Sequence, residues 1–279
     1  MQSSSKIKAV IFSKDRASQL LLLLDTYHSN CLDIDQIQTA VIYKCSGEKH
    51  TKQYASVQTL HPEIQFIEED TLEKDTKRFW SDADYIFFMV DDCVFVKPFE
   101  VLRIVSLLQK KEACLGFSLR LGQNTTYCYP FSKNQCVPIF EHVEDDIMQY
   151  NWTRSELDFG YPLEVSSSIF RMADLRSILS SISFSTVNEL ESILASHTKL
   201  FSMEKQNLLC FELSRAFCNP LNVVSCPETN KNRRSELPEN SSEYLTSQFE
   251  KGYKIDPSCF IDFVPNACHQ EVSLNWIQR

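Results

Sequence analysis

Two adjacent carboxylates, Asp91 and Asp92, directly follow an almost entirely apolar run from Ala83 to Val90. A strand covered on both faces has this composition, and an unpaired charge buried at its end would be costly. A divalent cation is the simplest partner for the pair, and oxygen ligands favour Mg²⁺ or Mn²⁺. The alternative is a strand end that faces solvent and caps neighbouring backbone groups.

A second polar group follows the first apolar run of the chain. Ile7–Phe12 is short and β-branched, Ser13–Arg16 closes it, and apolar residues then recur at helical spacing from Leu20 to Tyr27. This pattern predicts a strand, a loop and a helix. Ser13 or Asp15 can cap that helix, which leaves its first N–H groups and the strand end facing one crevice.

The same unit repeats along the first half of the chain. Thr39–Tyr43 precedes the polar loop Lys44–Glu48, Ile64–Ile67 precedes an acidic loop, and Pro98 opens a helix that extends to Leu108. Strands that alternate with helices predict an α/β fold with a largely parallel sheet and helices on both faces. The strand ends then share one edge, which places the loops 13–16 and 44–46 beside the two aspartates as a nucleoside pocket. Base stacking would involve Tyr43 or a nearby apolar side chain.

The second half has a different pattern. Cys114–Arg120 and Glu164–Phe170 read as strands on either side of a long stretch rich in Asn, Tyr, Pro and acidic residues, which we expect to be a substrate-side excursion. Helices are predicted at about 188–196 and 203–217, and a last short strand at 223–224. A single domain over residues 1–279 accommodates all of these elements.

Composition excludes several classes of protein. Lys and Arg number 28 and Asp and Glu 37, and the net charge of -9 argues against a general nucleic-acid binder. The apolar runs are far shorter than the roughly 20 residues of a membrane span, and no secretory h-region follows Met1, so we expect a cytoplasmic protein without a transmembrane segment. The eleven cysteines contain no CxxC pair and read as reduced thiols. Among them, Cys210 and Cys218 would share a face of the predicted helix.

Two segments resemble the opening of GT-A fold glycosyltransferases of the family 2 type. They are Ala9-Val-Ile-Phe-Ser-Lys-Asp-Arg16 with its leucine-rich helix, and Tyr85-Ile-Phe-Phe-Met-Val-Asp-Asp-Cys-Val-Phe95. The resemblance implies a GT-A fold in which residues 6–112 bind the nucleotide and 113–279 form the acceptor side and a C-terminal extension. The family's Asp-x-Asp motif carries the metal, but one of its aspartates is here Met89 or Cys93, depending on the register.

The resemblance also implies roles for individual residues. The nucleotide-diphosphate sugar donor would be held by a group that follows the first, second and fourth strands: Ser13, Asp15, Arg16, Tyr43, Ser46 and Asp91. The metal, Mn²⁺ or Mg²⁺, would bind Asp91 and Asp92. In many GT-A enzymes a late histidine completes the metal shell, and His269 suits that place; the alternative is an ordinary surface histidine. A neutral imidazole has a reference pKa of about 6.5, so metal binding through it should weaken below about pH 6.

An inverting transferase needs a carboxylate that takes the proton of the acceptor hydroxyl. Ser168–Arg171 is similar to the family's segment before the acceptor helix, and Glu191 falls where that helix carries its acid. We rank Glu191 first, with Glu189 as its neighbour one turn earlier, and Asp158 second. Two further acidic sites compete less well: Glu164, and the run Glu144–Asp146, which comes too early in the chain.

The sequence thus favours a metal-dependent glycosyltransferase that acts on an unidentified acceptor. A degenerate transferase used as a non-catalytic binding module is the first alternative, and the imperfect metal motif supports it. A nucleotidyltransferase is the second, although Ser13–Arg16 lacks the glycines of a phosphate loop. The basic run Lys231–Arg234 would either close over the pyrophosphate or form a solvated loop.

Overall fold

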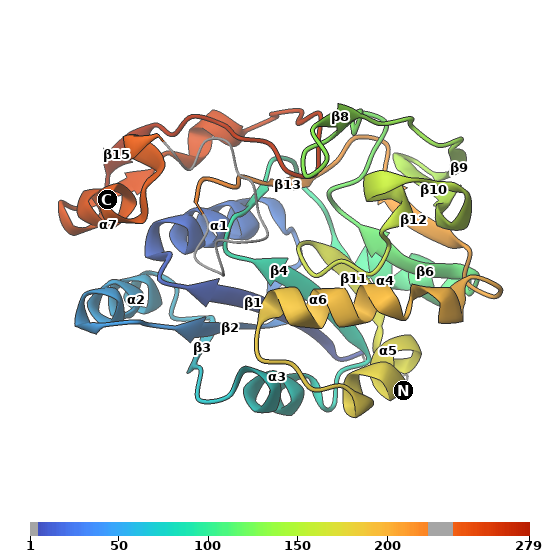
Figure 1. The fold of residues 1–279 in the computed structure, drawn as a ribbon, viewed down its shortest axis with the longest axis horizontal. Coiled ribbons are helices and arrows are strands. Elements are labelled where there is room, and N and C mark those ends of the chain that lie inside the picture. The colour runs from blue at the N-terminus through green and yellow to red at the C-terminus, as the bar shows by residue number, and fades with distance from the viewer. Residues whose placement is uncertain (1–4, 223–236) are drawn as a thin grey trace.

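A computed structural model describes residues 5–222 and 237–279 of the chain. Within these residues nine strands form one sheet in the order β3-β2-β1-β4-β11-β6-β12-β10-β9 (Figure 1). The strands of this sheet are β1 (Ile7–Lys14), β2 (Gln38–Lys44), β3 (Gln65–Glu68), β4 (Tyr85–Val90), β6 (Cys114–Ser118), β9 (Glu141–Glu144), β10 (Ile147–Asn151), β11 (Ser168–Arg171) and β12 (Asn207–Phe211).

Three small two-stranded sheets accompany the large one in the described chain. They pair β5 (Cys93–Phe95) with β13 (Ala216–Cys218), β7 (Tyr127–Cys128) with β8 (Lys133–Asn134), and β14 (Tyr253–Ile255) with β15 (Trp276–Gln278). The α-helices are α1 (Ala17–Asn30), α2 (Glu48–Leu60), α3 (Leu72–Trp80), α4 (Val101–Lys110), α5 (Met172–Ser181), α6 (Val187–Ser196) and α7 (Ser242–Glu250). Among the described helices none is long and apolar enough to cross a bilayer.

The predicted α/β fold is confirmed, and its parallel part lies where the sequence indicated. The strands β3, β2, β1 and β4 pair in parallel, so their carboxyl ends meet at one edge. In the second half only β6 and β12 pair in parallel, whereas β11, β10 and β9 run antiparallel to their neighbours. The sheet as a whole is therefore mixed, with β4 near its centre.

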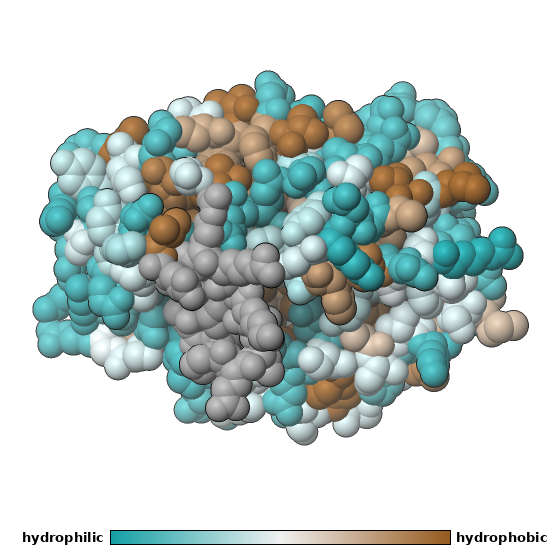
Figure 2. Space-filling model, turned by 45° about the horizontal axis from the view of Figure 1, so that its top comes forward, coloured by the Kyte–Doolittle hydropathy of each residue, from teal (hydrophilic) through white to brown (hydrophobic). Residues whose placement is uncertain are grey.

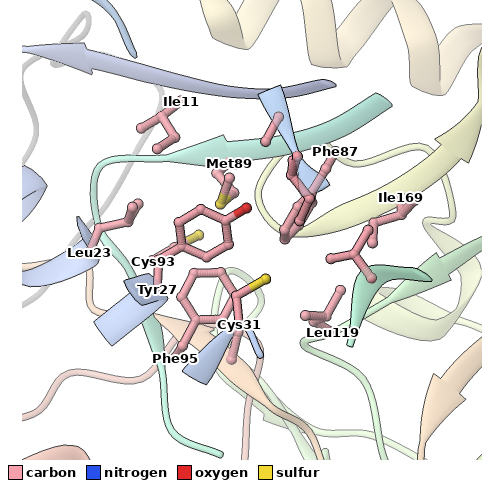
Figure 3. Close-up of a cluster of buried hydrophobic side chains, with 14 of the residues drawn as sticks. Ile11, Leu23, Tyr27, Cys31, Phe87, Met89, Cys93, Phe95, Leu119 and Ile169 are labelled. Atoms are coloured by element: carbon pink, nitrogen blue, oxygen red, sulfur yellow. The ribbon is translucent and has the colours of Figure 1, made fainter. Parts of the chain in front are cut away.

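Side-chain alternation along the strands builds a core on each face of the sheet. Phe87 of β4 packs with α1, α2 and α4 on one face, and Phe88 packs with α3, α5 and α6 on the other. Helix α6 runs across the sheet on this second face (Figure 1). On the first face, the Tyr27 ring lies 5.4 Å from that of Phe95 and 6.1 Å from that of Phe87, in the cluster drawn in Figure 3. On the surface drawn in Figure 2, hydrophobic side chains lie in separate patches among hydrophilic ones.

Two local predictions are wrong. Residues 203–217 were expected to form a helix, but they contain β12 and the start of β13, because Leu208–Phe211 is a buried run inserted between β6 and β10. Cys210 and Cys218 consequently lie on different strands. Helix α1 is also not capped by Ser13 or Asp15, since no side chain caps its N-terminus. The strand expected at 223–224 lies outside the described residues.

Candidate functional site

The carboxyl ends of β1 and β4 meet at Asp91, which is buried. Its Oδ2 accepts hydrogen bonds from Ser13 Oγ at 2.9 Å and from the Lys14 backbone N–H at 3.3 Å. Its Oδ1 accepts from Arg16 Nη1 at 2.9 Å. Both oxygens of this carboxylate are therefore already engaged by groups of the first strand and its loop.

Arg16 provides the positive charge for both aspartates. Its Nη1 lies 2.9 Å from Asp91 and 3.7 Å from Asp92 Oδ2. Its Nε donates to Asn222 Oδ1 at 3.0 Å, and its Nη2 donates to the Asn222 carbonyl. The guanidinium thus pairs with the strand end and ties it to Asn222, which follows β13.

The potential ligand atoms beside Asp92 are sulfur atoms, which are softer than the oxygen ligands that Mg²⁺ and Mn²⁺ prefer. Its carboxylate lies within 4.8 Å of the Cys93 and Cys218 thiols, and those two sulfur atoms are 3.4 Å apart. Burial, partly offset by Arg16, raises the pKa of Asp92. Both oxygens of Asp91 accept hydrogen bonds and two thiols stand beside Asp92, so this donor set does not fit the divalent ion that the sequence led us to expect.

The two loops expected beside the aspartates lie together at this edge. The Ser46 backbone N–H and hydroxyl donate to the two oxygens of Asp15 at 2.7 and 2.6 Å. Asp15 has a positive φ of 56°, a conformation that aspartate tolerates better than most residues. The predicted adjacency of the loops 13–16 and 44–46 is thus confirmed.

Tyr43, which we expected to stack on a base, is engaged elsewhere. Its side chain is buried, its ring stacks on Tyr54 at a centroid distance of 4.7 Å, and its hydroxyl accepts from Gln58 Nε2 at 3.1 Å. Tyr54 in turn shares a 2.5 Å hydrogen bond with Ser13. In this structure the Tyr43 ring is buried against Tyr54 and is not placed to stack on a base.

A cavity of about 260 Å³ opens beside β6, β11 and β12. Neither Asp91 nor Asp92 lines it. Its lining comes from β6, β11, β12, α6, the loops between 121 and 168, and the C-terminal segment: Ser118, Arg120, Leu121, Pro130, Phe131, Leu157, Asp158, Tyr161, Glu164, Ser168, Glu191, Leu208, Cys268 and His269.

Glu191 on α6 is the acid with the most shifted ionisation in this cavity. Burial first, and then the charge of Glu164, raise its pKa to about 7. It accepts one long hydrogen bond, from the Val165 backbone N–H at 3.4 Å. A carboxylate with a pKa near the working pH is suited to general base catalysis. The structure thus places Glu191 where a proton acceptor would be useful.

The competing Glu189 has a structural task. Helix α6 begins after Thr186, whose hydroxyl accepts from the Glu189 backbone N–H at 3.1 Å. The Glu189 carboxylate accepts from the backbone and hydroxyl of Ser185, and these hydrogen bonds lower its pKa. Thr186 and Glu189 therefore cap the helix, and this cap fixes the position of Glu191 on the first turns.

Glu164 is held by three donors and keeps little capacity for a substrate. It accepts from Arg120 Nη2 at 2.7 Å, from the Ser166 backbone N–H and from the Ser168 hydroxyl. Its negative charge still acts on Glu191. Asp158 also lines the cavity: it accepts from Gln135 Nε2 at 3.0 Å, and burial raises its pKa.

His269 lines the cavity, and its ring contacts the guanidinium of Arg120. Its Nε2 lies 3.3 Å from Arg120 Nη1, and the same nitrogen of Arg120 lies 3.5 Å from the Cys218 sulfur. Because arginine only donates, Nε2 must accept, and the proton of the neutral ring sits on Nδ1. Burial and Arg120 lower the pKa of His269 to about 3. A pKa this low keeps the ring neutral near pH 6. Metal binding through His269 stays a prediction.

Sequence reasoning missed Arg120, which organises Glu164, Cys218 and His269. Its only signal was a charge at the end of the predicted strand 114–120. The early acidic run pairs with Arg103, whose guanidinium lies within 3.3 Å of Glu144, Asp145 and Asp146. The basic run Lys231–Arg234 lies outside the described residues.

One relative of this chain in sequence is a transferase. The bifunctional glycosyltransferase pgtA of Dictyostelium discoideum is 28% identical over 198 residues, which are 63% of this chain and 25% of that protein. The chain thus spans about a quarter of the length of this relative. The resemblance to glycosyltransferases indicated by the motifs is confirmed as a distant sequence similarity.

Solved glycosyltransferase structures are similar to parts of the fold. The mannosyltransferase PcManGT from Pyrobaculum calidifontis, in complex with GDP-Man and Mn²⁺, matches with a TM-score of 0.45 and 9% identity over 77% of this chain and 59% of that one. S. aureus TarS 1-349 in complex with UDP matches with a TM-score of 0.46 and 12% identity over 88% of this chain and 72% of that one. No protein-family model matches the chain.

Proposed function

We propose that this chain transfers a sugar from a nucleotide-diphosphate donor to an acceptor hydroxyl, with Glu191 as the general base. The observation that carries the proposal is the placement of a carboxyl group with a pKa of about 7 in a cavity beside the strand-end edge of the sheet. The distant similarity to a glycosyltransferase supports the same reaction class.

In the proposed reaction the acceptor oxygen attacks the anomeric carbon as its proton passes to a Glu191 oxygen. The bond from that carbon to the diphosphate breaks, and the nucleoside diphosphate leaves. A single displacement of this kind inverts the anomeric configuration. Glu164 raises the basicity of Glu191 through its negative charge, and Arg120 fixes Glu164 in place.

The donor would bind across the strand ends. In open α/β sheets, ligands bind in the crevice outside the carboxyl ends of the strands. Here the paired Asp15 and Ser46 join the two loops of that crevice. The proposed chemistry has no step on Mn²⁺ or Mg²⁺, because both oxygens of Asp91 accept hydrogen bonds from the chain and Asp92 stands beside two thiols.

The pairing of Asp91 and Asp92 with Arg16 favours a second candidate function. An aspartate pair neutralised by Arg16 suits a degenerate transferase that binds a nucleotide sugar without turning it over. The deciding experiment incubates the protein with a panel of nucleotide sugars and simple glycoside acceptors and measures release of nucleoside diphosphate. Each reaction runs with Mn²⁺ and with EDTA. The transferase is supported if the Glu191→Gln variant no longer releases nucleoside diphosphate while the Glu189→Gln variant still does. Binding of a nucleotide sugar without release of nucleoside diphosphate supports the binding module.

A further inference from the structure

The cavity beside Glu191 carries an excess of negative charge. Three carboxyl groups line it, those of Asp158, Glu164 and Glu191. The guanidinium of Arg120 is paired with Glu164 at 2.7 Å. His269 is neutral near pH 7, because burial and Arg120 hold its pKa low. A ligand with a phosphate or carboxylate would therefore meet net repulsion here.

Three buried polar atoms of residues that line this cavity lack a partner within the described chain. They are Ser118 Oγ, Arg120 Nε and His269 Nδ1. Buried polar groups are normally hydrogen-bonded, so these three atoms are unsatisfied within the described chain. Two of the three are N–H donors, while the Glu191 carboxyl group, which accepts one long hydrogen bond from Val165, is an acceptor. A hydroxyl group both donates and accepts, so it can match either kind.

The volume of the cavity and the side chains that line it restrict the class of ligand. The cavity of about 260 Å³ is smaller than the roughly 300–1,000 Å³ of pockets that hold drug-sized ligands. At its rim the rings of Phe131 and Tyr161 are 67% and 39% exposed, and Leu121 and Leu208 line its wall. A hydroxylated ring with an apolar C–H face can pack on such aromatic groups while its hydroxyls reach the polar ones.

We propose that this cavity binds one uncharged sugar ring, so that the acceptor is a carbohydrate whose reacting end carries neither phosphate nor carboxylate. Asp158 and Glu191 are its specificity-determining charges. The proposal rests on the proposed function, because it names the acceptor of that reaction.

The first test measures binding without turnover. Methyl glycosides of neutral hexoses are titrated by ligand-observed NMR against methyl glucuronide and glucose 6-phosphate, with and without UDP or GDP. We expect saturable binding of at least one neutral glycoside and at least tenfold weaker binding of both anionic sugars. Equal or tighter binding of an anionic sugar, or no saturable binding of any neutral one, would overturn the proposal.

The second test changes the charge of the cavity. In Asp158→Asn, the preference for neutral over anionic sugars should fall about tenfold, since one nearby charge is removed from a site of low effective dielectric. Glu191→Gln provides an independent readout if Asp158→Asn does not fold. The control Asp145→Asn removes a charge that is 82% exposed and does not line the cavity, and its preference should match that of the unaltered chain. An unchanged preference in both cavity variants contradicts the inference.

Transfer assays separate this inference from the function on which it rests. Transfer to anionic acceptors alone would overturn the assignment of a neutral sugar as acceptor and would leave the proposed transferase function in place. Binding of neutral glycosides without transfer from any nucleotide sugar would overturn the transferase and leave the assignment of the cavity.

Discussion

Replacing Glu191 with Gln should stabilise the folded chain at alkaline pH while it abolishes transfer. The pKa of Glu191 is raised from 4.5 to about 7, so the native state holds its proton more tightly than the unfolded state does. Stability therefore falls as pH rises from about 4.5 to 7 and is level above that range. A pKa raised from 4.5 to about 7 corresponds to roughly 3 kcal/mol of stability, at about 1.4 kcal/mol for each tenfold change in proton affinity.

The amide of the Glu191→Gln variant does not ionise, so the variant does not lose stability between pH 4.5 and pH 7. We expect the Glu191→Gln variant to melt roughly 5–10 °C above the unaltered protein at pH 8.5, from the usual relation between stability and Tm for a chain of this size. The gap should shrink steadily between pH 7 and pH 5. Transfer activity should drop by about 10²–10⁴, the usual contribution of a general base.

Thermal unfolding followed by circular dichroism from pH 5 to pH 9 checks this expectation. Glu189→Gln is a matched control with the opposite sign, because hydrogen bonds from Ser185 lower the pKa of Glu189 and stabilise the fold above its unfolded pKa. That variant should be less stable than the unaltered chain at neutral pH. A Tm difference for Glu191→Gln that does not change with pH would refute the assigned environment of Glu191.

Three other outcomes can be measured on the same preparations. Arg16→Gln leaves the Asp91 charge buried without its partner, so chemical denaturation at pH 7 should show a loss of about 3–5 kcal/mol, and equal stability would disprove the pairing. The thermal shift caused by UDP or GDP should be the same in EDTA as in Mn²⁺, because the donor set does not suit a hard cation; a shift seen only with Mn²⁺ would show that the aspartates rearrange to bind it. Titration of His269 by NMR should show a neutral ring with Nδ1 protonated down to about pH 4, and a midpoint near pH 6 would contradict its contact with Arg120.

Local patterns were sufficient to predict the parallel half of the sheet. Each apolar run from β1 to β4 is short, ends in polar residues and is followed by a helix or loop of the expected length. Because strand ends in a parallel sheet share an edge, the adjacency of Asp91 with the Ser13–Arg16 loop followed from the order of elements alone. The helix that carries Glu191 was predicted at about 188–196, and Glu191 was chosen on it by resemblance to the acid of the family's acceptor helix.

The contacts that decide the chemistry were not predictable in this way. Arg16 pairs with a carboxylate 75 residues away, and Arg120 contacts His269 across 149 residues. No local pattern indicates which distant charge a side chain meets, so the ion pair of Asp91 with Arg16 could not be predicted. The predicted helix at 203–217 failed for the same reason, since Leu208 and Leu209 owe their strand conformation to β6 and β10.

The separation between Arg120 and His269 has a consequence for synthesis of the chain. At about 5–20 residues per second, a ribosome needs roughly 7–30 s to add the 149 residues between them. The strands β1 to β4 form from neighbouring segments and can pair within that interval. The segment that carries Cys268 and His269 is made later, so the cavity that they line is completed after the parallel strands have been made. Until then Arg120 lacks its contact with His269.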